Sequence, residues 1–552
     1  MDLSEKHSLV HFPRDRRHII RPSTQFLSAM AIIALVPVIF AWIYYKLWGL
    51  PILPHASFNF NAHTSGFPSW IRITHFLNYI LLTLLMRSGL QILMDHPRLY
   101  WNMHCTPGSE WVRFTPLKIP LDKHWTARDD SRYLSPWIGL PGYRHTIGMA
   151  RHWHFMSVFF WILNGVFFVI LLLVTDYWKR IIPHDIQIFK DAWIVFVHYA
   201  TLHMPPEPNG FYQFNPLQSL AYFVTIFIFS PLMILTGIAM SPSMDNRFKF
   251  YPLIFGNRQI ARSIHFLGLL SFLGFLVVHV TLVVITGFTQ NMNHIVLGSD
   301  DTHSRIGIIL GGLAVTFLAL VCFVAHKIAW RIPRKVQHFS AKLLAPLNQL
   351  VFDSLKPRVQ YSEKDISQYF WKNGKIPANT TWEAMAQNEF KDYRLKVHGL
   401  VEEPMEFSLK DLQKMEKRSQ IILNHCIQGW SGIAQWAGVP MSEIVAHVRP
   451  KPEAEFVICW SFGEGLEGGP YYATHSILET MQEQTLLVYE MNYGPLPTDY
   501  GAPLRLRIEN KLGYKMVKWI ESIEFVESYR KIGKGEGGKS EDDEYFGFSA
   551  GI

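Results

Sequence analysis

The sequence is poor in cysteine, and its first 330 residues are poor in charge. Four cysteines among 552 residues are too few for a disulfide scaffold. Residues 1–330 carry only 25 basic and 15 acidic side chains, whereas residues 331–552 carry 27 and 29. The sequence also lacks internal repeats, low-complexity tracts and basic runs interleaved with aromatic residues, which excludes solenoid, disordered and nucleic-acid-binding proteins. The composition indicates a membrane domain followed by a soluble domain.

Six stretches are long and apolar enough to cross a bilayer, which takes about 20 helical residues. They cover residues 27–48, 71–94, 153–175, 217–240, 262–287 and 306–330. Lipid tolerates only closed backbone hydrogen bonding, so each stretch is expected to be a helix. The sequence therefore predicts an all-α six-helix transmembrane bundle over 27–330, surrounded by membrane lipid and preceded by an N-terminal segment over 1–26.

Lys and Arg are distributed unevenly around these spans. The side that holds both termini carries 21 of them near the spans, and the opposite side carries six. The positive-inside rule therefore predicts a bacterial-type inner (plasma) membrane protein with its termini and soluble domain in the cytoplasm. The sequence Arg16-Arg17-His18-Ile19-Ile20 loosely resembles a twin-arginine export motif, which favours the other side.

The second half has the pattern of a soluble α+β domain over 361–552, after a basic and then amphipathic linker over 331–360. Short helices are expected at 409–417 and 476–483. Strand-like runs cover residues 394–397, 406–409, 421–424, 455–460, 485–489, 504–508 and 517–525. The Gly-, Lys- and acid-rich tail over 533–543 is predicted to be a loop.

Four of the five histidines inside the predicted spans are well placed for a shared role, and an imidazole there is costly without a partner. His265 and His279 share one helix at a spacing of 14 residues, which places them within roughly 40° of one face and about 21 Å apart along the axis. On antiparallel neighbouring helices, His75 lies level with His279, and His154 lies level with His265. Neutral imidazole is a standard axial ligand of haem, so the pattern predicts two bis-histidine haem sites stacked across the membrane.

A single membrane histidine is more often an interfacial or hydrogen-bonded core residue, and only the matched depths favour haem. His152 competes with His154 because it is half a turn away. His198 and His203 are expected at an interface, with a quinone site as the alternative, and His326 at an interface. The residues predicted to admit a flat macrocycle or to meet haem propionates are Gly89, Gly165, Gly268 and Gly274, and Arg72, Arg87, Arg151 and Arg262.

Several motifs between residues 70 and 290 carry a family resemblance. They include Arg72-Ile-Thr-His75, Arg151-His-Trp-His154, Asn215-Pro-Leu-Gln-Ser-Leu-Ala-Tyr222, Arg262-Ser-Ile-His265 and His279-Val280. They resemble the dihaem cytochrome b subunits of formate dehydrogenases, hydrogenases and thiosulfate reductases. The resemblance implies the same two histidine pairs as haem ligands and exchange of electrons with quinone. The additional first span departs from the four-helix core of that family.

Cys426 differs from the other cysteines in its surroundings. It follows the strand-like run 421–424 and opens a Gly-rich segment up to Pro440, predicted as a loop that enters an apolar turn. Glycines allow a bulky cofactor close to the backbone, and soft thiolate suits a high-valent metal. From the residues alone, a metal ligand and a catalytic nucleophile stay equally open, although no His/Asn or His/Asp constellation supports the nucleophile. Cys105, Cys322 and Cys459 are expected to be small buried hydrophobes.

A second set of motifs runs in family order over residues 361–527. It comprises Asp392-Tyr-Arg-Leu-Lys-Val-His-Gly-Leu400, Cys426 with Gly429-Trp430, Tyr489-Glu-Met-Asn492, Gly501-Ala-Pro-Leu-Arg505 and Gly513-Tyr-Lys-Met-Val-Lys518-Trp519. These motifs resemble the molybdopterin domain of the sulfite oxidase family, which includes bacterial methionine-sulfoxide reductase catalytic subunits.

That resemblance implies that Cys426 is the catalytic thiolate ligand of molybdenum, beside the dithiolene of the pterin. It also implies cofactor contacts from Tyr369, Phe370, Lys372, Asn373, Ser461, Arg505, Met516, Val517 and Lys518. Arg505 would meet the pterin phosphate. Sulfite oxidases have Arg-Asn-His where this chain has Lys372-Asn373-Gly374, which puts sulfite as the substrate in doubt.

The sequence therefore predicts a membrane-bound molybdenum oxidoreductase that exchanges electrons between a Mo-molybdopterin site and the quinone pool through two b-type haems. The small-molecule reaction is reduction of an S- or N-oxide or oxidation of a small anion, and the incomplete sulfite-binding set favours reduction. The alternative is a haem electron-transfer protein whose soluble domain is a docking module without molybdenum. A homo-oligomer stays open, and the lack of a two-half repeat disfavours a transporter.

Overall fold

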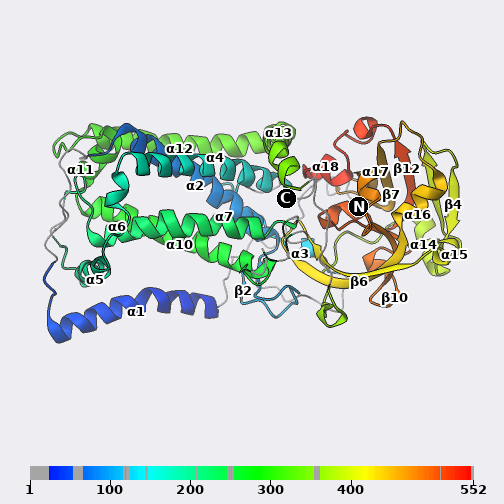
Figure 1. Cartoon of the computed structure of the whole chain (residues 1–552), viewed down its shortest axis with the longest axis horizontal. Helices are drawn as coiled ribbons and strands as arrows, with labels where there is room; N and C mark the ends of the chain where they lie inside the picture. Colours follow the sequence, from blue (N-terminus) through cyan, green and yellow to red (C-terminus); the bar gives the residue numbers. More distant parts are fainter. Residues whose placement is uncertain are drawn as a thin grey trace, which may run out of the picture.

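The structure is a computed structural model that describes residues 24–53, 66–115, 119, 125–142, 147–205, 209–242, 244, 248, 250, 254–352, 361–509 and 511–548. A bundle of long helices and a domain built on β-sheets follow each other along the longest axis (Figure 1). The predicted N-terminal segment up to residue 23, with its Arg16-Arg17 motif, and the linker residues 353–360 lie outside the described residues.

The described residues contain six helices long and apolar enough to cross a membrane, which confirms the predicted bundle. They are α1 (Thr24–Trp48), α2 (Ser69–Asp95), α4 (Ile147–Val174), the continuous α6 (Pro216–Phe223) and α7 (Ser230–Ala239), α10 (Arg258–Ile285) and α12 (Ile306–Arg331). A π-helical stretch, Val224–Phe229, joins α6 to α7 close to Pro231, which has no N–H to donate. The chain is a multi-pass membrane protein.

Shorter elements lie in the connections of the bundle. They are α3 (Ala127–Asp130), α5 (Gln187–Ala200), α11 (Phe288–Met292) and the strand pair β1 (Arg98–Leu99) and β2 (Val112–Arg113). The β1–β2 pair and α3 lie at the end of the bundle that meets the soluble domain, whereas α5 and α11 lie at the far end (Figure 1).

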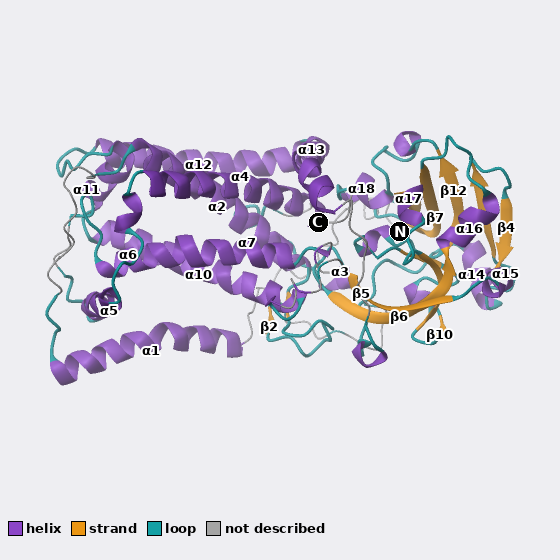
Figure 2. Cartoon of the chain, viewed as in Figure 1, coloured by secondary structure: helices purple, strands orange, loops and turns teal. Residues whose placement is uncertain are grey.

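Two five-stranded sheets form the soluble domain (Figure 2). One has the order β10-β9-β6-β5, with β11 also on β9, and the other has the order β4-β3-β12-β7-β8. The strands are β3 (Arg394–Gly399), β4 (Met405–Ser408), β5 (Arg418–His425), β6 (Ser431–Pro440), β7 (Phe456–Glu464), β8 (Pro470–Ser476), β9 (Leu486–Met491), β10 (Gly494–Pro495), β11 (Arg505–Arg507) and β12 (Ile520–Val526). The helices are α14 (Thr380–Gln387), α15 (Leu409–Lys414), α16 (Met441–Val448) and α17 (Ile477–Thr480). The predicted α+β fold is confirmed.

The predicted loop after Cys426 is wrong in its second part, because Ser431–Pro440 forms the ten-residue strand β6. Every residue of β6 is buried, and β5 and β9 pair with it on either side. A strand covered on both faces shows no alternation of polar and apolar residues, so period-2 analysis does not detect it. Gly438 also looks like a loop residue in the sequence. In the strand a glycine is needed there, because the backbone of Leu487 leaves no room for a Cβ.

The predicted loop in the C-terminal tail is also wrong. Residues Lys539–Glu544 form α18, and four successive polar side chains of α18, from Ser540 to Asp543, are buried. In the linker, α13 (Pro333–Phe352) supplies Arg334 and Gln337, which donate to the carbonyl oxygen of Glu541 at 2.9 and 3.2 Å. The backbone of this segment therefore holds the linker helix against the C-terminal tail.

Gly148 of α4 allows this contact, and enlarging it should loosen the tail. A Cβ at Gly148 would meet the Phe546 ring and would lie 2.7 Å from the Glu544 carbonyl oxygen. Overpacking of this kind costs about 1–3 kcal/mol. In Gly148→Val, we expect faster hydrogen–deuterium exchange over 539–548. Gly312→Val is the control, since Gly312 is exposed and a Cβ there has no neighbour within 4 Å. Equal exchange in the two variants would contradict the close contact.

Candidate active site and histidine pairs

The four predicted membrane histidines meet in two pairs. The ring centroids of His75 and His279 are 6.4 Å apart, and those of His154 and His265 are also 6.4 Å apart. Two imidazoles on opposite sides of one metal, with metal–nitrogen bonds of about 2.0–2.1 Å, have ring centroids roughly 6 Å apart. Each pair therefore has the spacing of two axial ligands of one haem iron.

Hydroxyl groups hold the pair nearer the soluble domain. Nδ1 of His154 lies 3.1 Å from Ser88 Oγ, and Nδ1 of His265 lies 2.9 Å from Thr236 Oγ1. A hydrogen bond at one ring nitrogen sets the tautomer and the ring orientation, and leaves the other nitrogen for a metal. These hydroxyl groups are the outer partners that an imidazole ligand of haem requires.

Small residues lie beside the same pair. A Cβ at Gly89 would be 3.4 Å from Cε1 of His154, so this glycine fits the prediction of space for a macrocycle. Gly268 instead packs against a methionine of α7, and positions Gly165 and Gly274 have no heavy atom within 4 Å of a Cβ.

His152 has a different role from His154. Its Nε2 lies 2.8 Å from the carbonyl oxygen of Tyr545, in the C-terminal tail. His154 faces His265 from the same helix, so the geometry favours His154 as the ligand. His198 lies on α5 at the edge of the bundle, and its Nε2 is 2.9 Å from the carbonyl oxygen of Pro51.

Two arginines predicted to meet haem propionates hold loops instead. Arg87 donates to the carbonyl oxygens of Pro136 and Gly139 at 2.7 and 3.1 Å. Arg262 donates to the carbonyl oxygens of Arg98 and His96, at 2.7 Å in both cases. The propionate contacts of these two residues stay a prediction, and in the structure their guanidinium groups stabilise the end of the bundle below the soluble domain.

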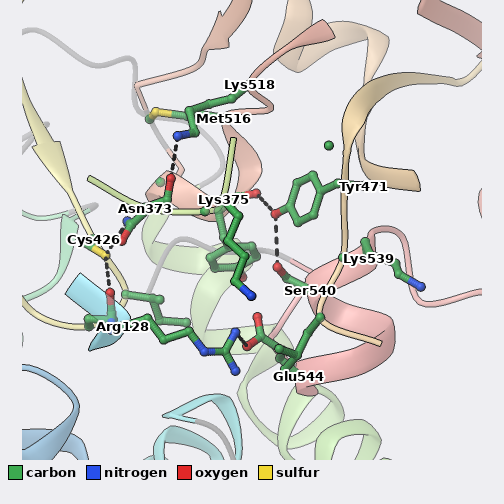
Figure 3. A pocket seen from close by; sticks show the side chains of 18 of the residues that line it. Arg128, Asn373, Lys375, Cys426, Tyr471, Met516, Lys518, Lys539, Ser540 and Glu544 are labelled. Atoms are coloured by element: carbon green, nitrogen blue, oxygen red, sulfur yellow. Dashed lines mark hydrogen bonds and ion pairs between the residues drawn. The ribbon is translucent and has the colours of Figure 1, made fainter. Parts of the chain in front are cut away.

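A cavity of about 250 Å³ lies where the two domains meet (Figure 3). Among the residues that line it are seven predicted from the family resemblance: Phe370, Asn373, Cys426, Ser461, Arg505, Met516 and Lys518. The membrane domain supplies Asp95, Arg128, Tyr133 and Ile147, and the tail supplies Lys539, Ser540, Asp543, Glu544 and Phe546. Both domains and the tail therefore build one site.

Cys426 lies in a tight turn directly after β5. The N–H of Gly429 donates to its carbonyl oxygen at 3.1 Å, and its own N–H donates to Trp430 at 3.1 Å. The thiol is 2% exposed, and Asn373 Nδ2 donates to Sγ at 3.3 Å. Burial raises the pKa of the Cys426 thiol to about 11, against the hydrogen bonds from Gln428 and Asn373 that lower it. A metal ion reverses this preference, because it binds the thiolate.

Two buried cations face the same cavity and fit an anionic group. The Arg505 guanidinium donates to the Tyr500 carbonyl oxygen at 2.8 Å, and its Nε has no acceptor within the described residues. The Lys518 ammonium donates to the carbonyl oxygens of Asn373 and Asp499. Burial lowers the pKa of both cations well below their usual values. Arg and Lys without a bound carboxylate suit the phosphate of a pterin cofactor.

Three predicted contact residues lie outside the cavity lining. The Lys372 ammonium pairs with the Asp499 carboxylate. Tyr369 packs edge-on against Trp371, with ring centroids 5.6 Å apart. Val517 is buried in the sheet core. These three side chains pack around the residues that line the cavity and are not part of its surface.

The sequence analysis missed every cavity residue outside the molybdopterin motifs. Lys375 and Tyr471 come from the soluble domain, and Arg128 pairs with Glu544 of α18 at 3.7 Å. No motif marks these residues. The one available signal was the density of charge in the tail, which was interpreted as a solvated loop.

Comparisons with known families divide the chain into the same two parts, a membrane domain and a soluble domain. Residues 66–298 match prokaryotic cytochrome b561, and residues 382–531 match the oxidoreductase molybdopterin binding domain. The chain joins a cytochrome b561-type membrane domain to a sulfite oxidase-family molybdopterin domain. These families confirm the resemblances found in the sequence, and they imply a molybdenum cofactor and b-type haem.

The curated relatives of this chain include methionine-sulfoxide reductase subunits. The "Putative protein-methionine-sulfoxide reductase subunit YedZ1" of Azospira oryzae is 31% identical over 154 residues, or 28% of this chain and 54% of that protein. The protein-methionine-sulfoxide reductase catalytic subunit MsrP of Xanthomonas campestris is 33% identical over 145 residues, or 24% and 45%. The chain spans about half the length of the curated relatives it matches. A structure of the sulfane dehydrogenase SoxCD from Paracoccus pantotrophus covers 25% of this chain and 39% of its own, at 22% identity and a TM-score of 0.23.

The raised pKa of Cys426 predicts a late titration in cofactor-free protein. The folded thiol keeps its proton up to a pH of about 11, whereas an unfolded thiol loses it near 8.5. The free energy of unfolding therefore falls as the pH rises from about 8.5 to about 11, because the unfolded state binds fewer protons there. The difference in thiolate absorbance between the wild type and Cys426→Ser should have its midpoint near 11, and loading with the cofactor should abolish the step. A midpoint near 8.5 would contradict the buried thiol.

Proposed function

We propose that the protein is a membrane-bound molybdenum oxidoreductase that exchanges electrons between a Mo-molybdopterin site and the quinone pool through two b-type haems. The observation that carries the proposal is the order of the sites. A cavity with a buried cysteine lies at one end of the bundle, and two histidine pairs follow it across the membrane. This order matches a path for electrons from one membrane face to the site.

In this proposal each histidine pair binds one haem iron. His154 and His265 form the proximal haem site, next to the soluble domain, and His75 and His279 form the distal one. Ser88 and Thr236 hold the proximal imidazoles through Nδ1, so that Nε2 is the ligand atom. The separation of His265 from His279 along α10 is about 21 Å.

The cavity residues have separable roles. Cys426 supplies the thiolate to the metal, and Asn373 donates a hydrogen bond to its sulfur. Arg505 and Lys518 supply positive charge for the cofactor phosphate. When bound, the molybdenum cofactor supplies two-electron redox chemistry. The burial of Cys426, Ser461 and Met516 keeps bulk water away from the sulfur.

The reaction we favour is reduction of an S- or N-oxide, in which two electrons and two protons convert the oxide into the parent compound and water. The names of the relatives support the S-oxide. Lys372 is occupied by Asp499, and the histidine of sulfite oxidases is replaced by Gly374, so the cation and imidazole expected for sulfite are both missing from the cavity lining. Oxidation of a small anion is the second possibility for the same site.

A second cavity, also of about 250 Å³, lies at the far end of the bundle, and we infer that it binds the quinone. Its lining combines apolar and ionisable side chains, among them Arg180, His184, Asp185 and Phe214. The Phe214 ring is 5.1 Å from the Tyr222 ring, which is 5.9 Å from the distal His279. The ionisable side chains suit the proton exchange of a quinone, and Ile182, Ile188 and Phe214 supply apolar contacts for its ring.

The distribution of charge supports one side of the membrane. The described parts of the Lys- and Arg-rich loops, with β2 and α3 among them, lie at the end of the bundle that bears the soluble domain (Figure 1). We infer that this end is cytoplasmic, by the positive-inside rule. The alternative function, a haem protein whose soluble domain only docks a partner, is distinguished by metal content, since it requires haem without molybdenum.

Replacing the cysteine ligand tests the enzyme. In detergent-purified Cys426→Ser, we expect loss of molybdenum and a fall in substrate-dependent turnover of more than about 100-fold, with the haem content unchanged. Cys322→Ser, a substitution in α12, should keep both metals. Metal analysis and turnover with small S- and N-oxides measure the outcome. Full molybdenum content and full turnover in Cys426→Ser would contradict the proposal.

Replacing neighbouring histidines tests the haem ligands. In His154→Ala we expect the haem content, measured as the pyridine haemochrome, to fall from two per chain to one. His152→Ala removes an imidazole two residues away that contacts the tail, and it should keep both haems. The reverse result would assign the ligand to His152.

A further inference from the structure

The turn that holds Cys426 is fastened to the first turn of α10. Nε2 of Gln259 donates to the Gly429 carbonyl oxygen and to Ser431 Oγ, at 2.9 Å in both cases. Nη1 of Arg258 donates to the same carbonyl oxygen at 3.2 Å. Cys426 is itself closed into this turn by its hydrogen bond with Gly429. The helix end and the cysteine turn therefore share a set of direct hydrogen bonds.

Gly429 and α10 pack so closely that the Cys426 turn has little room to shift. Gly429 has φ +107°, a conformation that side chains rarely adopt, and a Cβ there would lie 3.1 Å from Nε of Arg262. Arg262 cannot easily move away, because its two terminal nitrogens bind loop carbonyl oxygens. Gln259 is fully buried, so its side-chain amide binds the turn without competition from water.

The same helix carries the proximal histidine. Gln259 and His265 are six residues apart, or about 9 Å along the helix axis. α10 is one unbroken helix from Arg258 to Ile285, and Thr236 holds the His265 ring at 2.9 Å. A displacement of the Cys426 turn relative to Gln259 therefore changes the distance from the sulfur to the proximal pair.

We propose that Gln259 is a positioning residue that holds the Cys426 turn on α10 and thereby sets the rate of electron transfer between the proximal haem and the molybdenum centre. The inference rests on the proposed function. In each transfer, one electron leaves the ferrous haem, which becomes ferric, and the molybdenum centre gains it. Two transfers and two protons serve each oxide that is reduced to its parent compound and water. Tunnelling rates fall exponentially with distance, so a small displacement has a large effect.

The test compares two electron donors in the full-length protein. In Gln259→Met, which keeps the length of the side chain and removes its amide, we expect turnover supported by quinol to fall tenfold or more. Turnover supported by a reduced viologen dye, which donates to the molybdenum site directly, should fall less than twofold. Gln259→Asn keeps the amide on a shorter side chain. Its quinol-supported turnover should lie between that of the wild type and that of Gln259→Met. Stopped-flow oxidation of the haem by a small S-oxide measures the step itself.

Ser263→Ala is the matched control. Ser263 lies one turn further along α10, and its hydroxyl donates to the Tyr100 carbonyl oxygen at 2.7 Å, not to the Cys426 turn. Its ratio of quinol to viologen turnover should equal that of the wild type. An unchanged ratio in both Gln259 variants, or an equal loss in Ser263→Ala, overturns the inference. If wild-type haem is not oxidised by any oxide although molybdenum is present, the proposed function fails instead.

Discussion

The junction between the two domains depends on buried hydrogen bonds from cationic and amide side chains to backbone carbonyl oxygens. Arg258 and Gln259 bind the Cys426 turn, and Arg262 binds the loop after α2. Burying a guanidinium without acceptors costs several kcal/mol, so acceptors for its N–H groups stabilise the junction. The carbonyl oxygens of tight turns are available because no helix or strand uses them. The arginines therefore specify one docking geometry and do not act as general electrostatic attraction.

The cavity follows from that geometry. Two guanidinium groups, those of Arg505 and Arg507, lie over the Trp436 ring, both 4.6 Å from its centroid. Arg507 is neutralised by two hydrogen bonds to Glu509 at 2.8 and 2.9 Å. Arg505 lines the cavity, and its Nε remains without an acceptor in the described part of the chain. Its charge is therefore available to an anionic group, which would also offset the cost of burying it.

The sequence predicted what periodicity and family motifs encode. Six apolar stretches predicted the helices. The 14-residue spacing of His265 and His279, together with the matched depths of His154 and His75 on neighbouring helices, predicted the two pairs. β6 was missed because a strand buried on both faces has no alternation. Arg128 and Glu544 were missed because they come from segments more than 400 residues apart that meet only after docking. Contacts between domains leave no local pattern, so only the folded chain shows them.

In the function we propose, one helix spaces three of the redox positions. α10 carries His265 and His279 at a fixed rise, and its first turn binds the segment with Cys426. A regular helix changes its length little under thermal motion, whereas a loop connection would let the distances vary. The spacing of the three positions is then a property of a single element. The fusion of the two domains in one chain keeps each domain at a high local concentration near the other. In the proposed function, α10 would add the fixed distances that electron transfer requires.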